Sequence, residues 1–443
     1  IPVPADASCS ASPGLWPITL PELPADLQAA TGNGVTVIVL DTLPPLEQIQ
    51  KAAQVAGDNN YLLQDVAHNV KFFYPTTADG LDTPGPGQPG TGKDIHGRLI
   101  GFTMPDHGMF VAGIIRSLAP KANIECIRVL NDKCTGSEQT LIDTLNAIYG
   151  RMSSGGNLKN TCVVINMSLV IPDDGEITRA GIDPTTIDMT HEHLREAIQN
   201  LVNLGAIFVA SAGNEGDQRY LPMSSERPDA LYPAAFAYNG LVHAERMIPV
   251  GAVDKDGNAT VYSCYPGIQG IATYGGDVPG AANIEDGGGY DMTAVKKIDA
   301  PIGLYTSPFY PALSIDDPQS TYPAPNASGW AYWIGTSFAT PIVSAVAARA
   351  LELNPHQAVP PNVTIPPLIV GGAATRQTMW TNLGSMSGGM STHTNPPPTA
   401  TAMGAMIWAV QCKPDELEDE EVEVTINIRE VNVIEIESHE PHS

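Results

Sequence analysis

The sequence predicts an α/β fold built on a mostly parallel central sheet with helices on both faces. A continuous run of apolar and β-branched residues, Val35–Leu40, has the composition of a strand that is buried on both faces, which is typical of parallel sheets. Further strand-like runs alternate with helical segments of about 10–15 residues, as βαβ units require.

The expected elements follow one another from the N-terminus. A short helix near residues 23–30 precedes the first strand, and the stretch 75–106 is so rich in Pro and Gly that we expect a long loop. The later strands are expected at 124–130, 162–169, 206–210 and 247–253, and the helices at 46–56, 108–115, 140–151, 191–204 and 336–353.

Composition and charge exclude two classes of partner. Apolar residues make up 43 % of the chain, which is enough for a sizeable core, and no apolar stretch reaches the roughly 18–20 residues of a membrane helix. The formal net charge of −26 repels phosphates and argues against a nucleic-acid partner. A solvated acidic surface and an adaptation to cationic substrates both fit this charge.

The chain divides into a body, 1–412, that begins with an irregular arm, 1–30, and an acidic tail, 413–443. The tail holds eleven acidic and two basic residues, and its apolar residues alternate with polar ones from Val422 to Ile428 and again from Val431 to Ile436. Such alternation predicts one or two half-buried strands. These strands have three possible docking places: the body, a second copy, or a domain outside the sequence.

Six cysteines fit disulfides in an oxidising compartment, although in so long a chain the inference is weak. Cys126 and Cys134 leave two alternatives open, a local disulfide or two buried thiols. The absence of a Cys-x-x-Cys pair argues against a thiolate zinc site. His191 and His193 resemble a metal-binding pair, but alternate residues on a helix point apart.

Four short motifs carry residues suited to hydrolytic chemistry. Ser337 opens a helix of small residues, where its backbone N–H can face a developing oxyanion. His107 precedes an apolar, Gly-containing helix start, and Asp41 ends the first strand, where α/β proteins place functional groups. Asn214 follows Gly213 after a strand, and its side-chain amide is a good oxyanion donor. Taken singly, each has a structural explanation as a helix cap, a core histidine or a turn residue.

Together, the order Asp, His, Asn, Ser with its flanking residues resembles the subtilase (subtilisin-like) family. The matching segments are Val39–Thr42, His107–Gly113, Ile165–Leu169, Ser211–Asn214 and Gly335–Pro341. The resemblance implies a subtilisin-like fold and a serine endopeptidase. It assigns Ser337 as the nucleophile, His107 as general base and acid, and Asp41 as the residue that orients His107. Asn214 and the Ser337 N–H would hold the oxyanion.

The same resemblance implies two substrate-binding segments. Ser168, Leu169 and Val170 would pair with an extended substrate backbone. The primary specificity pocket, expected to be apolar, would be lined by Ala210, Ser211, Ala212 and Gly213.

The chain departs from the family pattern at two of these places. Leu43–Pro45 replaces the usual Gly after Asp-Thr and could shift the Asp41 carboxylate, and Val170 replaces a Gly and could narrow the binding edge. A calcium loop found in some members has no counterpart after Gly113, so we predict no calcium there, while other acidic loops leave calcium binding open. No cofactor is expected to be required.

The resemblance also implies polypeptide substrates, an extracellular location and a cleaved N-terminal inhibitory segment, since the sequence begins at Ile1. One alternative is a surface or filament-forming structural protein that retains the fold and assembles through residues 413–443. An ester hydrolase with a Gly-x-Ser-x-Gly elbow does not fit, because Thr336 and Phe338 flank the serine.

Overall fold

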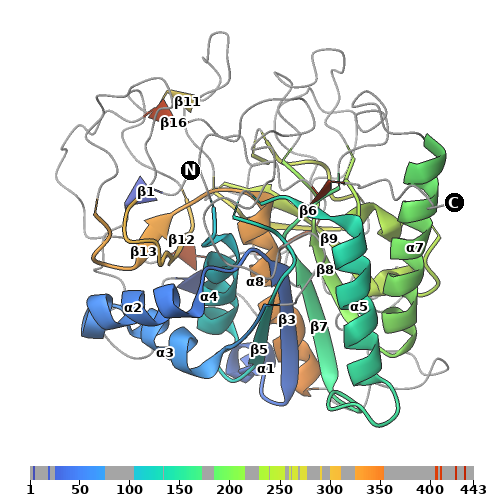
Figure 1. The fold of residues 1–443 in the computed structure, drawn as a ribbon, viewed down its shortest axis with the longest axis horizontal. Coiled ribbons are helices and arrows are strands. Elements are labelled where there is room, and N and C mark those ends of the chain that lie inside the picture. The colour runs from blue at the N-terminus through green and yellow to red at the C-terminus, as the bar shows by residue number, and fades with distance from the viewer. Residues whose placement is uncertain are drawn as a thin grey trace, which may run out of the picture.

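The computed structural model describes residues 3–4, 18–19, 25–74, 104–132, 134–171, 184–214, 229–238, 240–254, 259–260, 262–267, 270–276, 290–291, 300–310, 325–353, 405–407, 410–411, 425–426 and 434–435. Within these ranges, eight strands form a central sheet in the order β14-β10-β9-β8-β7-β3-β5-β4, and every neighbouring pair runs parallel. Figure 1 labels the strands of this sheet from β9 to β5. The eight strands are β3 (Val35–Asp41), β4 (Lys71–Phe73), β5 (Asn123–Arg128), β7 (Cys162–Met167), β8 (Ile207–Ser211), β9 (Met247–Val253), β10 (Ile271–Tyr274) and β14 (Ala405–Ile407). The predicted α/β class is therefore confirmed.

Helices cover both faces of this sheet, as the buried strand β3 requires. They are α1 (Ala25–Ala29), α2 (Leu46–Ala56), α3 (Tyr61–Asn69), α4 (His107–Leu118), α5 (Glu138–Met152), α7 (Pro184–Asn203) and α8 (Thr336–Leu353). Val37 and Val39 pack on the side of α4 and α8, whereas Ile38 and Leu40 pack on the side of α5 and α7. This alternation gives the sheet one apolar core on each face.

Smaller sheets complete the described structure. Antiparallel β1 (Val3–Pro4), β13 (Trp330–Tyr332) and β12 (Ile302–Leu304) form one of them. The pairs β2 (Ile18–Thr19) with β15 (Val410–Gln411) and β11 (Tyr290–Asp291) with β16 (Thr425–Ile426) are antiparallel, and β6 (Gly136–Ser137) with β17 (Ile434–Glu435) is parallel. Among the described residues of the tail, β16 and β17 are short strands, and both pair within the same chain.

The Cys126–Cys134 disulfide, one of the two alternatives left by the sequence, is not formed. The described cysteines Cys126, Cys134, Cys162 and Cys264 are all buried thiols, so the expectation of disulfides is wrong for them. Cys126 lies on β5 and belongs to the apolar core on the side of α4. Cys9 and Cys412 lie outside the described residues.

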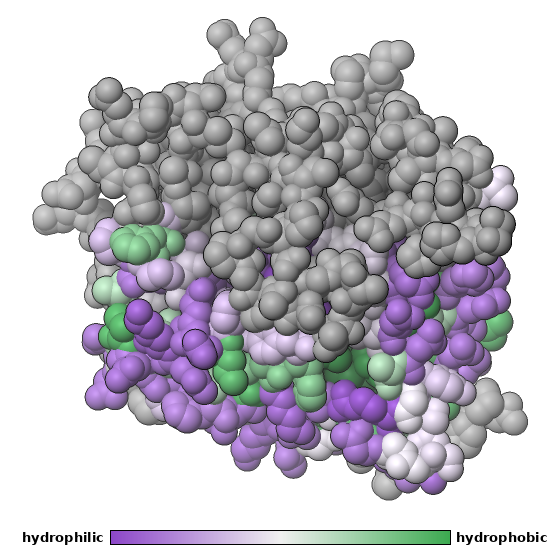
Figure 2. Space-filling model, in the orientation of Figure 1, coloured by the Kyte–Doolittle hydropathy of each residue, from purple (hydrophilic) through white to green (hydrophobic). Residues whose placement is uncertain are grey.

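Polar residues dominate the described part of the face shown in Figure 2. Among the described residues, no helix is both long and apolar enough to cross a membrane. On α7, His191 is buried against the Tyr232 ring, whereas His193 is exposed, so the two imidazoles lie on different faces of the helix.

Candidate active site

Asp41 and His107 meet where the carboxyl end of β3 contacts the first turn of α4. The His107 Nδ1 lies 2.8 Å from the Asp41 Oδ1, and neither side chain is more than 1 % exposed. The Thr42 N–H also donates to Oδ1, at 2.6 Å. The predicted pairing of the carboxylate with the imidazole is therefore present in the structure.

The Leu43–Pro45 corner does not turn the carboxylate away from His107. Asp41 Oδ1 keeps its contact with His107 Nδ1 at 2.8 Å. Among the described residues, the other carboxylate oxygen, the buried Asp41 Oδ2, has no hydrogen-bond partner. The departure from the family pattern therefore leaves the pairing of Asp41 with His107 in place.

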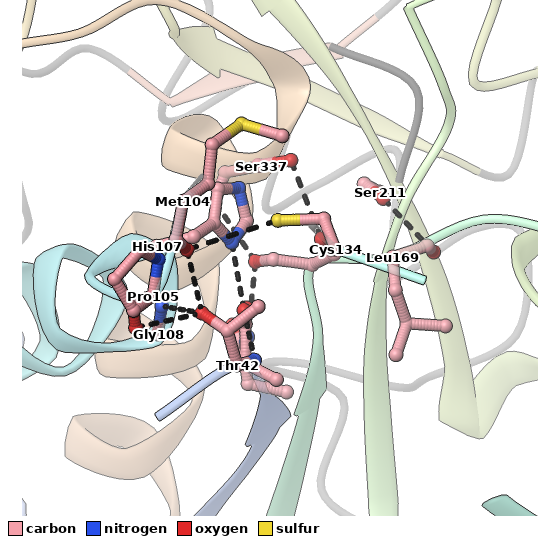
Figure 3. A network of polar contacts seen from close by, with 12 residues as sticks. Thr42, Met104, Pro105, His107, Gly108, Cys134, Leu169, Ser211 and Ser337 are labelled. Carbon is pink, nitrogen blue, oxygen red and sulfur yellow. Dashed lines mark hydrogen bonds and ion pairs between the residues drawn. The ribbon is translucent and has the colours of Figure 1, made fainter. Parts of the chain in front are cut away.

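The close approach of α4 to β3 depends on Thr42 and Gly108. The single proton of the Thr42 hydroxyl is shared between the carbonyls of Met104 and Pro105, at 3.1 and 3.0 Å, and the hydroxyl oxygen accepts the Gly108 N–H at 3.2 Å (Figure 3). Gly108 has no Cβ, so the helix can lie directly on the Asp41–Thr42 backbone.

Aromatic rings hold the His107 imidazole on its other sides. The Trp333 ring meets it edge-on with centroids 5.4 Å apart, and the Phe338 ring lies tilted at 5.1 Å. Phe338 directly follows Ser337 in α8, so this packing places His107 beside the turn that carries the predicted nucleophile. Edge and tilted contacts of this kind are favourable arrangements of rings, so they help to hold the imidazole in place.

Ser337 is the second residue of α8, which begins at Thr336 as predicted. Its side chain is buried, and its hydroxyl donates to the Ser168 carbonyl at 3.3 Å. That distance is long for an O–H···O hydrogen bond. Catalytic hydrogen bonds commonly tighten only when substrate is bound.

A proline in α8 explains a second contact between Ser168 and Ser337. Pro341 has no N–H, so the Ser337 carbonyl lacks its usual partner four residues along the helix. The Ser168 hydroxyl fills this place and donates to the Ser337 carbonyl at 2.8 Å. Asn166 and Ser344 extend the network, because the Asn166 amide donates to the Ser168 hydroxyl at 3.1 Å and accepts from the Ser344 hydroxyl at 2.9 Å.

The Asn214 side chain is fixed by the residue before Ser337. Its Oδ1 accepts from the Thr336 N–H at 3.0 Å and from the Thr336 hydroxyl at 2.9 Å. The Thr336 N–H can only donate, so the Asn214 atom that faces this N–H is the Oδ1. The Asn214 Nδ2 group, with its two protons, points in another direction. Gly213 makes the turn possible, with a φ of 113° that favours glycine. The structure thus places an amide donor beside the first turn of α8.

The two predicted substrate-binding segments extend from adjacent strands. Ser168, Leu169 and Val170 follow β7, while Ala210 and Ser211 end β8 and lead into Ala212 and Gly213. The Ser211 hydroxyl donates to the Leu169 carbonyl at 3.2 Å and joins the segments (Figure 3). Val170 is buried, and its narrowing of this edge stays a prediction. Their contact with a substrate stays a prediction.

An ion pair between the buried Arg128 and the partly buried Asp132 lies near the Asp41 carboxylate and was not assigned a role from the sequence. Arg128 is the register partner of Asp41 across β3 and β5, and its fully buried guanidinium contacts the Asp132 carboxylate at 2.8 Å. Burial raises the pKa of Asp132, and the positive charge of Arg128 opposes that rise. Arg128 therefore supplies positive charge at an edge of the sheet that also carries Asp41.

Comparison with known proteins finds one family and several relatives. The sequence profile of the subtilase family matches residues 32–393. M-protease of Shouchella clausii (strain KSM-K16) is 25 % identical over 350 residues, a match that spans 77 % of this chain and only 60 % of that protein. Subtilisin Savinase of Lederbergia lenta is also 25 % identical over 350 residues, which make up 85 % of its length.

Two solved structures resemble the chain at lower identity. A lanthipeptide protease gives a TM-score of 0.43 at 20 % identity, covering 74 % of this chain and 77 % of its own. A cold adapted subtilisin-like serine proteinase gives 0.38 at 19 % identity, covering 74 % and 81 %. The family profile, which spans well over half of the sequence, shows that the chain belongs to the subtilase family.

Proposed function

We propose that the protein is a serine endopeptidase that hydrolyses peptide bonds through an acyl-enzyme. The observation that carries this proposal is the buried hydrogen bond from His107 to Asp41, beside the helix turn that holds Ser337. Membership of the subtilase family supports it. The arrangement matches the division of roles in a Ser-His-Asp triad.

The first half of the reaction forms the acyl-enzyme. The Ser337 Oγ attacks the carbonyl carbon of the peptide bond while its proton passes to the His107 Nε2. The Asp41 carboxylate accepts the Nδ1–H, which fixes the tautomer and stabilises the imidazolium. The Asn214 Nδ2 and the Ser337 N–H donate to the oxyanion of the tetrahedral intermediate.

The second half releases the products. As the C–N bond breaks, the His107 Nε2 returns its proton to the leaving amine. Water then enters, and its oxygen attacks the acyl carbon while the His107 Nε2 takes one of its protons. The bond from the acyl carbon to the Ser337 Oγ breaks, the carboxylic acid product leaves, and His107 returns its proton to the Ser337 hydroxyl. The reaction consumes one water and needs no cofactor.

A fluorophosphonate probe tests the nucleophile directly. We expect the folded protein to be labelled, with the adduct mapping to Ser337, and Ser337→Ala to lose both labelling and peptide hydrolysis. Ser117→Ala is the matched control, because Ser117 is also a buried helical serine but donates only to the Ile114 carbonyl of its own helix. If folded protein is neither labelled nor active on a random peptide library, the proposal is wrong.

The alternative of assembly through the tail receives no support from the described residues, since β16 and β17 pair within the chain. Deleting residues 413–443 and measuring particle size by light scattering tests it. A larger particle for the full chain that becomes a monomer on deletion would support self-association. The extracellular location and the cleaved N-terminal segment stay predictions from the sequence.

A further inference from the structure

Asp106, the residue before His107, directs its carboxylate away from the helix that it precedes. An Asp at this position usually accepts a hydrogen bond from an N–H of the first helical turn. Asp106 makes no such bond with α4, and the Thr42 hydroxyl accepts the Gly108 N–H instead, at 3.2 Å. The Asp106 carboxylate is therefore available to residues outside the helix.

Four donors from the segment after β12 converge on this carboxylate. Its Oδ1 accepts from the Thr306 N–H at 2.7 Å and from the Thr306 hydroxyl. Its Oδ2 accepts from the Ser307 N–H at 2.9 Å and from the Ser307 hydroxyl. Gln48 of α2 donates to the same two hydroxyl oxygens at 3.0 and 3.3 Å. The hydroxyl protons are thus directed at Asp106, which is 0 % exposed.

The geometry of the donors matches a carboxylate. Each oxygen faces one backbone N–H, a group that can only donate, so both oxygens must accept. Burial raises the pKa of Asp106, and the hydrogen bonds from Ser307 and Thr306 oppose this rise. Loss of any of the four donors would leave part of a buried charge without compensation, so the side chain has little freedom to move.

We propose that Asp106 is the positioning residue of His107. Its carboxylate fastens the first turn of α4 to Thr306 and Ser307, while Thr42 holds the same turn from the side of β3. With both anchors, the imidazole is kept at the 2.8 Å contact with Asp41. The inference rests on the proposed role of His107 as general base.

The test is the isosteric change Asp106→Asn. One acceptor oxygen becomes an NH₂ group that faces a backbone N–H, so the hydrogen bonds to either Thr306 or Ser307 are lost. A misplacement of about 1 Å costs roughly 10²-fold in rate, so we expect kcat and the rate of fluorophosphonate labelling to fall about 30- to 100-fold. KM for a peptide substrate should stay within about twofold, because the binding segments are untouched.

Asp65→Asn is the matched control. Asp65 of α3 pairs with Arg116, which lies near the other end of α4. This change loosens the same helix far from His107, so it should lower the midpoint of thermal unfolding and leave kcat unchanged. If Asp106 only stabilises the fold, then Asp106→Asn and Asp65→Asn should lose the same amount of kcat whenever they lose the same amount of stability.

Thr306→Val provides a milder second variant if Asp106→Asn does not fold. It removes one hydroxyl donor and keeps both backbone donors, so we expect kcat to fall several-fold at unchanged KM. Wild-type kcat in Thr306→Val, or in a folded Asp106→Asn, overturns the inference while the proposed function stands. A wild-type protein that neither hydrolyses peptides nor labels overturns both.

Discussion

Gly108→Ala is the substitution that tests most directly how α4 is seated on β3. A Cβ at this position would lie 2.2 Å from the Thr42 carbonyl oxygen and 2.9 Å from the Asp41 Cβ. Ordinary contact begins at 3.4 Å. The nearest obstacle is a backbone atom, so no side-chain rotation relieves the clash, and the helix must move outward by about 1 Å.

This displacement sets the expected magnitude. The His107–Asp41 contact is 2.8 Å, and an increase of about 1 Å takes it beyond hydrogen-bonding distance. We expect kcat/KM to fall roughly 10²-fold, by analogy with similar misplacements. The strain of the added methyl group should lower the free energy of unfolding by about 1–3 kcal/mol.

Peptide hydrolysis, fluorophosphonate labelling and urea unfolding measure these effects together. Gly150→Ala is the control, because Gly150 lies inside α5 and an added Cβ there meets nothing within 4 Å. That change should leave activity unaltered and raise stability by about 0.5–1 kcal/mol. Wild-type activity in folded Gly108→Ala would refute the reasoning that the close approach of α4 to β3 sets the position of His107.

Three further predictions concern the oxyanion donor, a helix anchor and a buried thiol. Asn214→Ala should lower kcat about 10²–10³-fold with KM little changed in steady-state assays, and unchanged kcat would exclude the amide as an oxyanion donor. Arg349→Ala should lower the free energy of unfolding by about 1–3 kcal/mol without changing kcat. The reason is that the Arg349 Nη1 donates to the Leu27 and Gln28 carbonyls at 2.9 and 3.0 Å. An unchanged urea midpoint would contradict this prediction. Burial raises the pKa of the Cys126 thiol, so its contribution to stability is complete below the unfolded pKa of about 8.5 and is lost as pH rises toward the folded value. The urea midpoint of the wild-type protein should therefore fall between about pH 8 and 10, and that of Cys126→Ala should fall less steeply. An equal slope in the wild-type protein and the variant would count against this linkage.

Local patterns located five strands of the central sheet and most of its helices, whereas α3, β4, β10 and β14 were not predicted. The strand Met247–Val253 and the helices Leu46–Ala56 and Thr336–Leu353 have the predicted bounds. α7 begins at Pro184, seven residues before the expected start at His191, since proline suits the first turn of a helix. The short edge strand β4 escaped prediction because Lys71–Phe73 offers too few residues for a periodic signal.

The sequence by itself predicted the strands β3, β5, β7, β8 and β9 of the sheet, the helices that flank them, and the segments that carry Asp41, His107, Asn214 and Ser337. Hydrophobic runs and short motifs are local properties of the chain. Only the tertiary structure decided which partners hold those residues. The Thr42 hydroxyl on the α4 terminus, the Ser168 hydroxyl on the carbonyl left open by Pro341, and the four donors around Asp106 all join segments at least 60 residues apart. Such contacts depend on strand order and helix packing, and no local pattern encodes them.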